Sequence, residues 1–520
     1  MARQELLLLV CFFLPQILVS EGAKILTVSQ LGASHYILMD KVSSILQDHG
    51  HQVTKLLNKE ATIPDLKEEE KPYKVIDWVL PEKNRNEILK HIHSLVEVLD
   101  GRDVFDVILK LWEHMGTSCS YLLHRDDIMN SLRNESFDLV FLDATDLCAF
   151  LIAEKLEKPF VVLLSMFHYV DFGLPSPLSY VPVYGSFLTD QMDFWGRVRN
   201  FLMSFVFYVK QWQMHSTFDN VIKEHFPEGS RPVFSHLLQK AELWFINCDF
   251  GFDFARPLLP NTVYIGGLLE KPIKPIPQDL ENFINKFNDT GFILVALGSF
   301  ISRFQTQTVL KEMNKAFANL SQGVIWKCDH SLWPKDIKLA QNVKMVNWLP
   351  QNDLLAHPSI RLFVTHCGMN SIMETIQHGV PIVGIPVFFD QPDNMVRVEA
   401  KKFGVSLQYN MLTAETLILK IKEVIEDKRY KSAAVAASII HWSQPLTPTQ
   451  RLVGWIDHIL QTGGAAHLKP YAFQQPWYEQ YLLDVFLFLL GLILCTLWLC
   501  RRLLGIVTWW LSGSRKLKKT

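Results

Sequence analysis

The residues best suited to chemistry lie close together in the chain, between residues 348 and 391. Within this stretch an apolar, β-rich run, RLFVTH, ends in His366, and Gly368 then allows a sharp turn into a helix expected to begin near Asn370 or Ser371. Free backbone N–H groups and the positive end of a helix dipole attract anions, and the His366 imidazole is an added donor. The pattern therefore predicts a diphosphate site.

Polar residues flank this unit on both sides. Trp348 and Gln351 precede it on a WLPQ turn, where an indole face can stack on a base and an amide can read the base edge. Asp390 and Gln391 follow the strand IVGIPVFF, at the carboxyl edge where open α/β sheets bind ligands. A lone Trp usually packs in a core and an exposed carboxylate is usually only solvated. Their spacing around His366 instead favours a nucleotide linked through phosphates to a sugar.

These residues resemble the nucleotide-sugar signature of the UDP-glycosyltransferase family, and the resemblance runs from about Lys24 to the C-terminal tail. It is closest to the small third subfamily of the mammalian enzymes. The resemblance implies a UDP-sugar co-substrate rather than a permanently bound cofactor. It also implies that Glu374 grips the ribose and that Asp390 and Gln391 hold the sugar hydroxyls. Ser371 and Glu374 equally fit an S-x-x-E capping box, which is a purely structural alternative.

Two positions depart from the family pattern. Most relatives read His-Gly-Gly-x-Asn, whereas this chain reads HCGMN, so the side chain of Cys367 is expected to enter where backbone approaches phosphate. Phe389 replaces a small Gly or Ala and is expected to narrow or reshape the sugar pocket. Cys367 and Met369 motivate an alternative function, a catalytically silent homologue that binds and modulates partner transferases.

The expected catalytic base is near the other end of the chain. His35 follows the first predicted strand at the entrance to a helix, where its imidazole can accept the proton of an acceptor hydroxyl. Asp143, at the end of FDLVFLD, is expected at a neighbouring strand tip, and the pair resembles the family's inverting His-Asp dyad. A lone His at a helix start is more often a cap, and Asp146 is an alternative partner. Ser299, which ends LVALGS, is a further candidate phosphate ligand.

Two α/β halves are expected to position these residues. Parallel strands are predicted at AKILTVSQ, HQVTKLL, SFDLVFLDA and PFVVLLS in the first half, and at GFILVALGS, GVIWK, VKMVNWL, LFVTH and PIVGIP in the second. Neither half carries G-x-G-x-x-G, which counts against a dehydrogenase. The arrangement suits the α/β GT-B fold, with two Rossmann-like domains facing a cleft. The helix predicted at TPTQRLVGWIDHILQ crosses back to the first domain in relatives.

Both ends of the chain carry membrane signals. Residues 1–22 read as a signal peptide, and the apolar run from about Tyr481, followed by basic residues, reads as a transmembrane helix. A type I protein of the endoplasmic reticulum is expected, and Lys516 and Lys518 resemble a dilysine retrieval signal. The expected segments are a signal peptide at 1–22, an acceptor domain at 23–267, a linker at 268–285, a UDP-sugar domain with return helix at 286–465, a transmembrane helix at 481–503 and a basic cytosolic tail at 504–520.

Composition excludes some functions. A net charge of -2 gives no electrostatic reason to expect nucleic acid. The five lumenal cysteines show no C-x-x-C spacing, so neither a disulfide framework nor a zinc site is predicted, and without D-x-D nothing visible requires a metal. The sequons at Asn134, Asn288 and Asn319 fit a lumenal body. A type I receptor or adhesion protein would leave the nucleotide signature unexplained.

The acceptor site is predicted only by composition. Residues 167–212 are rich in aromatic side chains, which suit a flat lipophilic acceptor, although core packing explains them equally well. The run NFLMSFVFYV, flanked by Arg197, Arg199 and Lys210, could lie in the membrane interface or form a buried core helix. The predicted function is transfer of a sugar to hydroxyls of small lipophilic molecules, with UDP-glucuronate as the family donor. The resemblance to the third subfamily implies UDP-N-acetylglucosamine, UDP-glucose or UDP-xylose as alternative donors. Homo- or hetero-oligomers with related transferases are expected partners.

Overall fold

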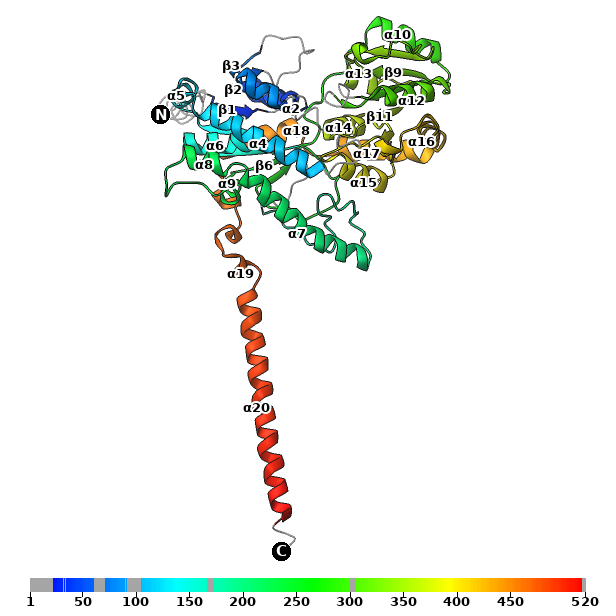
Figure 1. Ribbon diagram of the computed structural model, residues 1–520. Coiled ribbons are helices and arrows are strands. Elements are labelled where there is room, and N and C mark those ends of the chain that lie inside the picture. Colours follow the sequence, from blue (N-terminus) through cyan, green and yellow to red (C-terminus); the bar gives the residue numbers. More distant parts are fainter. Residues whose placement is uncertain are drawn as a thin grey trace, which may run out of the picture. The chain divides into compact units, whose positions relative to one another are not determined.

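The computed structural model describes residues 22–30, 32, 34–59, 71–88, 90, 104–165, 173–298 and 305–516. The predicted signal peptide up to residue 21, Ser299 and Lys518 lie outside these residues. The chain divides into two compact units, Met1–Ala466 and His467–Thr520. The first unit contains two parallel β-sheets with helices packed against them (Figure 1).

The first sheet has seven parallel strands in the order β3-β2-β1-β4-β5-β6-β7. Strands β4 and β5 are buried along their whole length, as expected when helices cover both faces of a parallel sheet. The strands are β1 (Lys24–Ser29), β2 (Gln52–Asn58), β3 (Lys74–Trp78), β4 (Leu139–Asp143), β5 (Phe160–Leu164), β6 (Trp244–Ile246) and β7 (Thr262–Tyr264). The helices of this half are α2 (Ser34–Asp48), α4 (Val104–Leu123), α5 (Asp126–Asn134), α6 (Leu147–Leu156), α7 (Phe194–Ser216), α8 (Asp219–His225) and α9 (Phe234–Gln239).

The second sheet has six parallel strands in the order β10-β9-β8-β11-β12-β13. The strands are β8 (Phe292–Ala296), β9 (Gly323–Lys327), β10 (Val343–Val346), β11 (Ile360–Thr365), β12 (Ile382–Gly384) and β13 (Gly404–Ser406). The helices are α10 (Gln278–Ile284), α12 (Gln307–Ala318), α13 (Gln351–Leu355), α14 (Met369–His378), α15 (Gln391–Ala400), α16 (Ala414–Glu426), α17 (Lys428–Trp442) and α18 (Pro448–Thr462).

Strand order explains where the functional residues meet. In each sheet the first strand of the half, β1 or β8, lies between the second strand and the fourth. Successive strands are added to the sheet in one direction before this point and in the other direction after it. In open α/β sheets, ligands bind at such a switch point, outside the carboxyl ends of the strands. His35 follows β1 and Asp143 ends β4, whereas His366 follows β11 beside β8. Each predicted set of site residues therefore lies at such a switch point.

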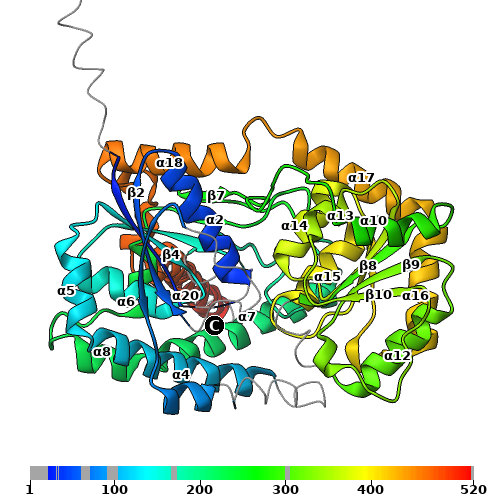
Figure 2. The same cartoon turned by 90° about the horizontal axis from the view of Figure 1, so that it is seen from above.

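The last helices of the first unit connect its two halves. Helix α17 packs against α14, and α18 packs against α2 of the first half (Figure 2). His51 Nε2 lies 3.3 Å from Asp457 Oδ1 of α18, and the backbone N–H of Ala465 donates to Glu242. The helix predicted after Pro445 is thus present as α18 and contacts the first half.

The second unit consists mainly of one long helix. After α19 (Trp477–Gln480), helix α20 runs from Leu483 to Lys516. Its stretch Leu483–Leu511 has a mean hydropathy of 2.5 and is long and apolar enough to cross a membrane. This stretch continues past Arg501 and Arg502, which separate two apolar runs of the helix.

One cysteine pair was not anticipated. Cys119 of α4 and Cys148 of α6 form a disulfide with a Cα–Cα distance of 5.4 Å. The expectation of no disulfide was therefore wrong for this pair. An odd number of sparsely spaced cysteines gives no pairing signal, because the bond depends on the packing of α4 against α6. Cys248, Cys328 and Cys367 are buried free thiols.

Candidate active site

The candidate base, His35, is held by hydrogen bonds to one of its two ring nitrogens, Nδ1. His35 lies in the first turn of α2, and its Nδ1 is 2.8 Å from Oδ2 of Asp143. Ser165, the residue after β5, places its hydroxyl oxygen 3.2 Å from the same nitrogen. The other carboxylate oxygen of Asp143 accepts the backbone N–H of Thr145 at 2.9 Å. This arrangement leaves Nε2 as the nitrogen that can exchange a proton with another molecule.

The charges around His35 favour its protonated form. Burial opposes a charge on the imidazole, but the charge and hydrogen bond of Asp143 outweigh it and raise the pKa of His35 above its usual value. Asp390 and Asp146 contribute further in the same direction. Burial also opposes ionisation of Asp143, but the neighbouring His35 and the Thr145 N–H lower the pKa of this carboxyl.

Asp146, the alternative partner, has a different role. Its carboxylate caps α6 by accepting the N–H of Cys148 at 3.1 Å, and it accepts the N–H of Gln30 at 3.0 Å. Burial and the charge of Asp143 raise the pKa of Asp146 to about 7. The side chain thus fixes the chain that leaves β1, while Asp143 makes the hydrogen bond to His35.

The predicted anion site begins where two glycines contact the His366 ring. Helix α14 starts at Met369, with Gly368 as its N-cap. A Cβ on Gly368 would lie 2.6 Å from His366 Nε2, and a Cβ on Gly298 would lie equally close. Burial, with the charge of Lys327, lowers the pKa of His366 to about 4. The imidazole is therefore neutral near pH 7 and can donate only through one N–H.

Two polar residues of α14, Ser371 and Glu374, bond to the first residue of α13 rather than to the start of their own helix. Ser371 lies two residues inside the helix, and the described side chains form no cap at Gly368, so the predicted capping box is wrong. The amide of Gln351 instead donates to Ser371 Oγ at 3.2 Å and to the Glu374 carboxylate. Burial raises the pKa of Glu374 to about 7, although the Gln351 hydrogen bond opposes this shift.

The two departures from the family pattern occupy left-handed backbone positions. Cys367 has φ 67° and Phe389 has φ 54°, a conformation that favours glycine. The Cys367 side chain is fully buried, with Sγ 3.0 Å from Met395 Sδ in the hydrophobic core. The expectation that it enters the phosphate site was therefore wrong. The ring of Phe389 packs edge-on against Phe388, with centroids 4.8 Å apart.

Trp348, Gln391 and Asp390 flank the anion site. Trp348 is 41% exposed, and the Lys327 ammonium lies 4.2 Å from the centre of its ring. The amide oxygen of Gln391 accepts the N–H of Val387 at 2.9 Å, which leaves its NH₂ group for other partners. Asp390 accepts the Asn394 amide at 2.6 Å, and burial raises the pKa of Asp390 to about 6.

Asn370 links the two sets of residues. Its Oδ1 accepts the Asn247 amide at 2.8 Å, and its Nδ2 donates to the carbonyl of Ser34 at 3.3 Å. Ser34 directly precedes His35. The helix start after β11 and the base after β1 are therefore in contact through one side chain, and the charge of Asp390 also acts on His35.

Sequence reasoning missed three residues of this site: Ser165, Asn247 and Lys327. Ser165 and Asn247 directly follow β5 and β6, and Lys327 is the last residue of β9. Their position at the carboxyl ends of predicted or neighbouring strands is the signal that could have found them. Ser299 lies outside the described residues, so its predicted role stays a prediction.

The chain is similar to known glycosyltransferases along almost its whole length. The profile of the UDP-glucoronosyl and UDP-glucosyl transferase family matches residues 23–516. Over 523 residues the chain is 67% identical to UDP-glucuronosyltransferase 3A2 of Homo sapiens, with 100% of both chains covered. It is 33% identical to the 2-hydroxyacylsphingosine 1-beta-galactosyltransferase of Homo sapiens over 489 residues, covering 91% of this chain and 86% of the relative.

Solved structures agree with the predicted fold class. A UDP-glucose: anthocyanidin 3-O-glucosyltransferase in complex with UDP matches with a TM-score of 0.57 and 15% identity, covering 85% of this chain and 100% of the other. At this identity the likeness concerns the fold alone. The two parallel sheets and this likeness confirm the GT-B arrangement.

Proposed function

Because this chain belongs to the UDP-glucuronosyl and UDP-glucosyl transferase family, and within it to the third subfamily, we propose that it transfers a neutral sugar from UDP to hydroxyls of small lipophilic molecules. The observation that carries the proposal is the contact between Asn370 and the carbonyl of Ser34. It joins the anion-binding helix start to the His35–Asp143 pair. A base beside an anion site suits the displacement of a nucleotide by a hydroxyl.

In the proposed reaction His35 Nε2 accepts the proton of the acceptor hydroxyl while the hydroxyl oxygen bonds to the anomeric carbon. The bond from this carbon to the β-phosphate oxygen breaks, and UDP leaves with the electron pair. Attack from the opposite face inverts an α-linked donor to a β-glycoside. Asp143 holds the Nδ1 proton and stabilises the imidazolium, and the start of α14 stabilises the departing diphosphate.

The turn before α13 is proposed to hold the nucleoside. The exposed indole of Trp348 stacks on uracil once the Lys327 ammonium moves from its face. The Gln351 amide, positioned between Ser371 and Glu374, reads the base edge. The ribose hydroxyls donate to Glu374, which favours the ionised form of this carboxyl over the protonated one.

The charges near Asp390 favour a neutral sugar. Asp393 lies close enough to contribute to the raised pKa of Asp390, and the preceding Phe388 and Phe389 supply no cation. A glucuronate carboxylate placed there would meet acidic groups, whereas the hydroxyls of glucose, xylose or N-acetylglucosamine can donate to Asp390 and accept from Gln391. The name of the 33% identical relative, a galactosyltransferase, is in keeping with a neutral donor.

Membrane association is proposed to bring the acceptor. Helix α20 has the length and composition of a membrane anchor, and α7 exposes a row of large apolar side chains. The interpretation of this segment as a buried core helix is wrong for that face. A disulfide and three exposed sequons support a lumenal position for the first unit. The proposal of a silent homologue loses its motive at Cys367, whose side chain points into the core.

The first prediction tests the base. His35→Ala should lower turnover by about 10²–10⁴ while leaving UDP affinity unchanged, because His35 acts on the acceptor. UDP release is measured in microsomes carrying the full chain, with UDP-glucose, UDP-N-acetylglucosamine, UDP-xylose and UDP-glucuronate against phenolic acceptors. His49→Ala, an exposed histidine after α2, is the matched control. Near-normal turnover of His35→Ala would show that another group is the base.

A further inference from the structure

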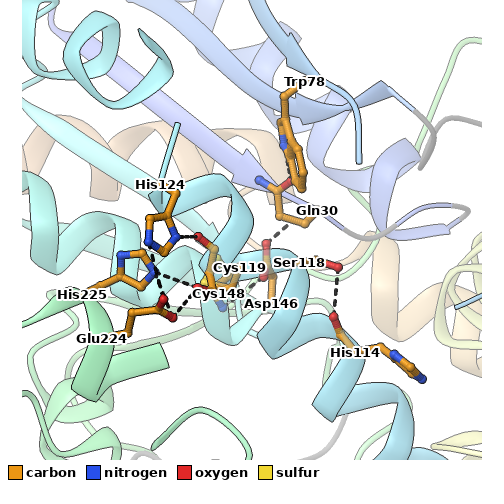
Figure 3. The surroundings of a disulfide bond; sticks show 11 residues. Gln30, Trp78, His114, Ser118, Cys119, His124, Asp146, Cys148, Glu224 and His225 are labelled. Atoms are coloured by element: carbon orange, nitrogen blue, oxygen red, sulfur yellow. Dashed lines mark hydrogen bonds and ion pairs between the residues drawn. A yellow bond between two sulfur atoms is a disulfide. The ribbon is translucent and has the colours of Figure 1, made fainter. Parts of the chain in front are cut away.

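Two histidines and a glutamate converge at the ends of two helices in the first half (Figure 3). His124 directly follows α4, and Glu224 and His225 end α8. His124 Nε2 lies 3.5 Å from Glu224 Oε1, and His225 Nε2 lies 3.8 Å from Glu224 Oε2. One nitrogen from each ring and one carboxylate oxygen all lie within 4.8 Å of one another. We infer that these three residues form a Zn²⁺ site.

The distances match the ligand sphere of this ion. Zinc binds imidazole nitrogen and carboxylate oxygen at about 2.0–2.2 Å, so adjacent ligand atoms of a tetrahedral site lie about 3.3–3.5 Å apart. The separations of 3.5 and 3.8 Å run to different oxygens of Glu224, and one ligand atom from each residue lies within 4.8 Å of the others. The exposed side chains of His124 and Glu224 must therefore move closer together to complete a tetrahedral site. Two imidazoles and one carboxylate suit Zn²⁺ better than Mg²⁺ or Ca²⁺, which prefer oxygen ligands. A fourth position would be filled by water, because His124 and Glu224 are exposed.

The orientation of His124 also suits a metal. Its Nδ1 lies 2.9 Å from the backbone carbonyl of Ser120, and its Nε2 faces Glu224. A hydrogen bond of this kind orients most metal-binding histidines.

Neighbouring groups hold the ligands in place before any ion binds. The Cys119–Cys148 disulfide fixes the last turn of α4, one residue before Ser120. The rings of His124 and His225 are already edge to face, with centroids 4.3 Å apart. Helices α4 and α8 pack directly against each other. Binding would thus connect two helices that are positioned beforehand, at a small cost in conformational entropy.

The cluster has an alternative hydrogen-bonding state without metal. The Ser120 hydroxyl donates to Glu224 Oε2 at 2.7 Å and lies 2.9 Å from His225 Nε2. With zinc bound, Ser120 keeps its bond to Glu224, and the ion replaces the hydroxyl at His225. The Lys155 ammonium, 3.0 Å from the His225 carbonyl, opposes a bound cation, and the Glu224 carboxylate compensates for it. No sequence motif could reveal the site, because its ligands come from distant segments.

The test uses the untagged full-length chain in detergent, stripped with a chelator and titrated with Zn²⁺ by calorimetry. One ion per chain is expected, and Co²⁺ should give the visible absorption of a four-coordinate site. His124→Ala and Glu224→Ala should each raise the Zn²⁺ Kd at least about tenfold, a loss that even outer-shell changes produce. Ser120→Ala should keep binding, since all three ligands remain.

His114→Ala is the matched control, because His114 lies on α4 and is no part of the cluster. His124 is exposed, so its replacement should leave the fold intact, and unchanged UDP affinity checks this independently of zinc. Absence of stoichiometric Zn²⁺ binding by the unaltered chain would overturn the inference. Equal Kd values for His124→Ala, Glu224→Ala and His114→Ala would overturn it as well.

Discussion

Asp143 raises the pKa of His35 through its charge and its hydrogen bond, and this leads to a prediction about pH. Transfer needs neutral His35, so the rate should fall as pH drops through its pKa, which is raised above 6.5. Asp143→Asn removes the charge that raises this pKa. The acidic limb of kcat/KM should therefore move to lower pH, while the plateau falls because the ring loses its orientation.

The pH profile is measured with one donor and one phenol, and Asp146→Asn is the comparison variant. Asp146 affects the pKa of His35 less than Asp143 does and bonds to backbone N–H groups instead, so its replacement should move the acidic limb less. If the acidic limb of the Asp143→Asn variant stays at the same pH, the limb does not report the titration of His35.

Trp348 and Phe389 are predicted to act on different parts of the donor. Trp348→Ala should weaken every UDP-sugar alike, by about 1–3 kcal/mol if uracil stacks as bases do on aromatic side chains. Phe389→Gly should change the ratio of kcat/KM between donors more than it changes UDP affinity, because specificity depends on differential transition-state contacts. Equal losses across donors for Phe389→Gly, or donor-selective losses for Trp348→Ala, would contradict this division.

The motif around His366 shows which features a sequence pattern can predict and which it cannot. The run RLFVTH followed by Gly368 correctly predicted a strand and a turn, because glycine and apolar periodicity report on backbone shape. The helix was expected to begin near Asn370 or Ser371 and begins at Met369. The motif did not predict where the Cys367 side chain points. With φ 67° the backbone turns Sγ toward Met395 and away from the helix start, and no residue type in the motif encodes that direction.

Helix α7 exposes most of its large apolar side chains on one face. Asn200 is fully buried, accepts the N–H of Val183 and donates to two nearby carbonyls, which anchors the opposite face. The exposed side chains are Phe194, Trp195, Phe201, Leu202, Phe205, Val206, Tyr208, Val209 and Trp212. An apolar row with aromatic residues and flanking cations is typical of a helix in a membrane interface.

Helix α7 is predicted to deliver the acceptor from the membrane. Replacing Phe201 and Phe205 by Ser should lower kcat/KM for a membrane-partitioning phenol, but not for a water-soluble one. The loss should reach at least about tenfold, since full burial of one Phe contributes about 1.5–3 kcal/mol. Ile439→Ser with Ile440→Ser on α17, equally exposed, is the matched control. The activities are measured with the full-length protein in nanodiscs. Equal losses of kcat/KM for both acceptors would contradict a role of α7 in the membrane interface.

Long apolar strands were predictable, and short ones were not. β1, β2, β4, β5 and β8 were predicted because buried parallel strands read as continuous apolar runs. β6, β7, β12 and β13 have only three residues each, and of these only β12 was predicted, within the run PIVGIP. Contacts such as Asn247 with Asn370 depend on how distant elements pack, which periodicity along the chain does not report.

For the whole molecule, the features of the first unit agree on one compartment. A disulfide between Cys119 and Cys148 is expected to persist only in an oxidising environment, and closing a loop of this length stabilises a fold by about 2–4 kcal/mol. The first unit also carries the candidate active site, whereas the second unit carries the apolar helix α20. A single helix that crosses the membrane would place all of the first unit on the same side.

The last prediction uses the three sequons to test on which side of the membrane the first unit lies. Asn134, Asn288 and Asn319 are all exposed, so an oligosaccharyltransferase in the lumen could reach each of them. In intact microsomes the first unit should resist added protease, and endoglycosidase H should lower its apparent mass. Replacing all three by Gln should abolish that mass change, whereas Asn282→Gln, an exposed Asn outside any sequon, should leave it unchanged. A protease-sensitive first unit without glycan would place the transferase on the cytosolic side, where the Cys119–Cys148 bond would not be expected to persist.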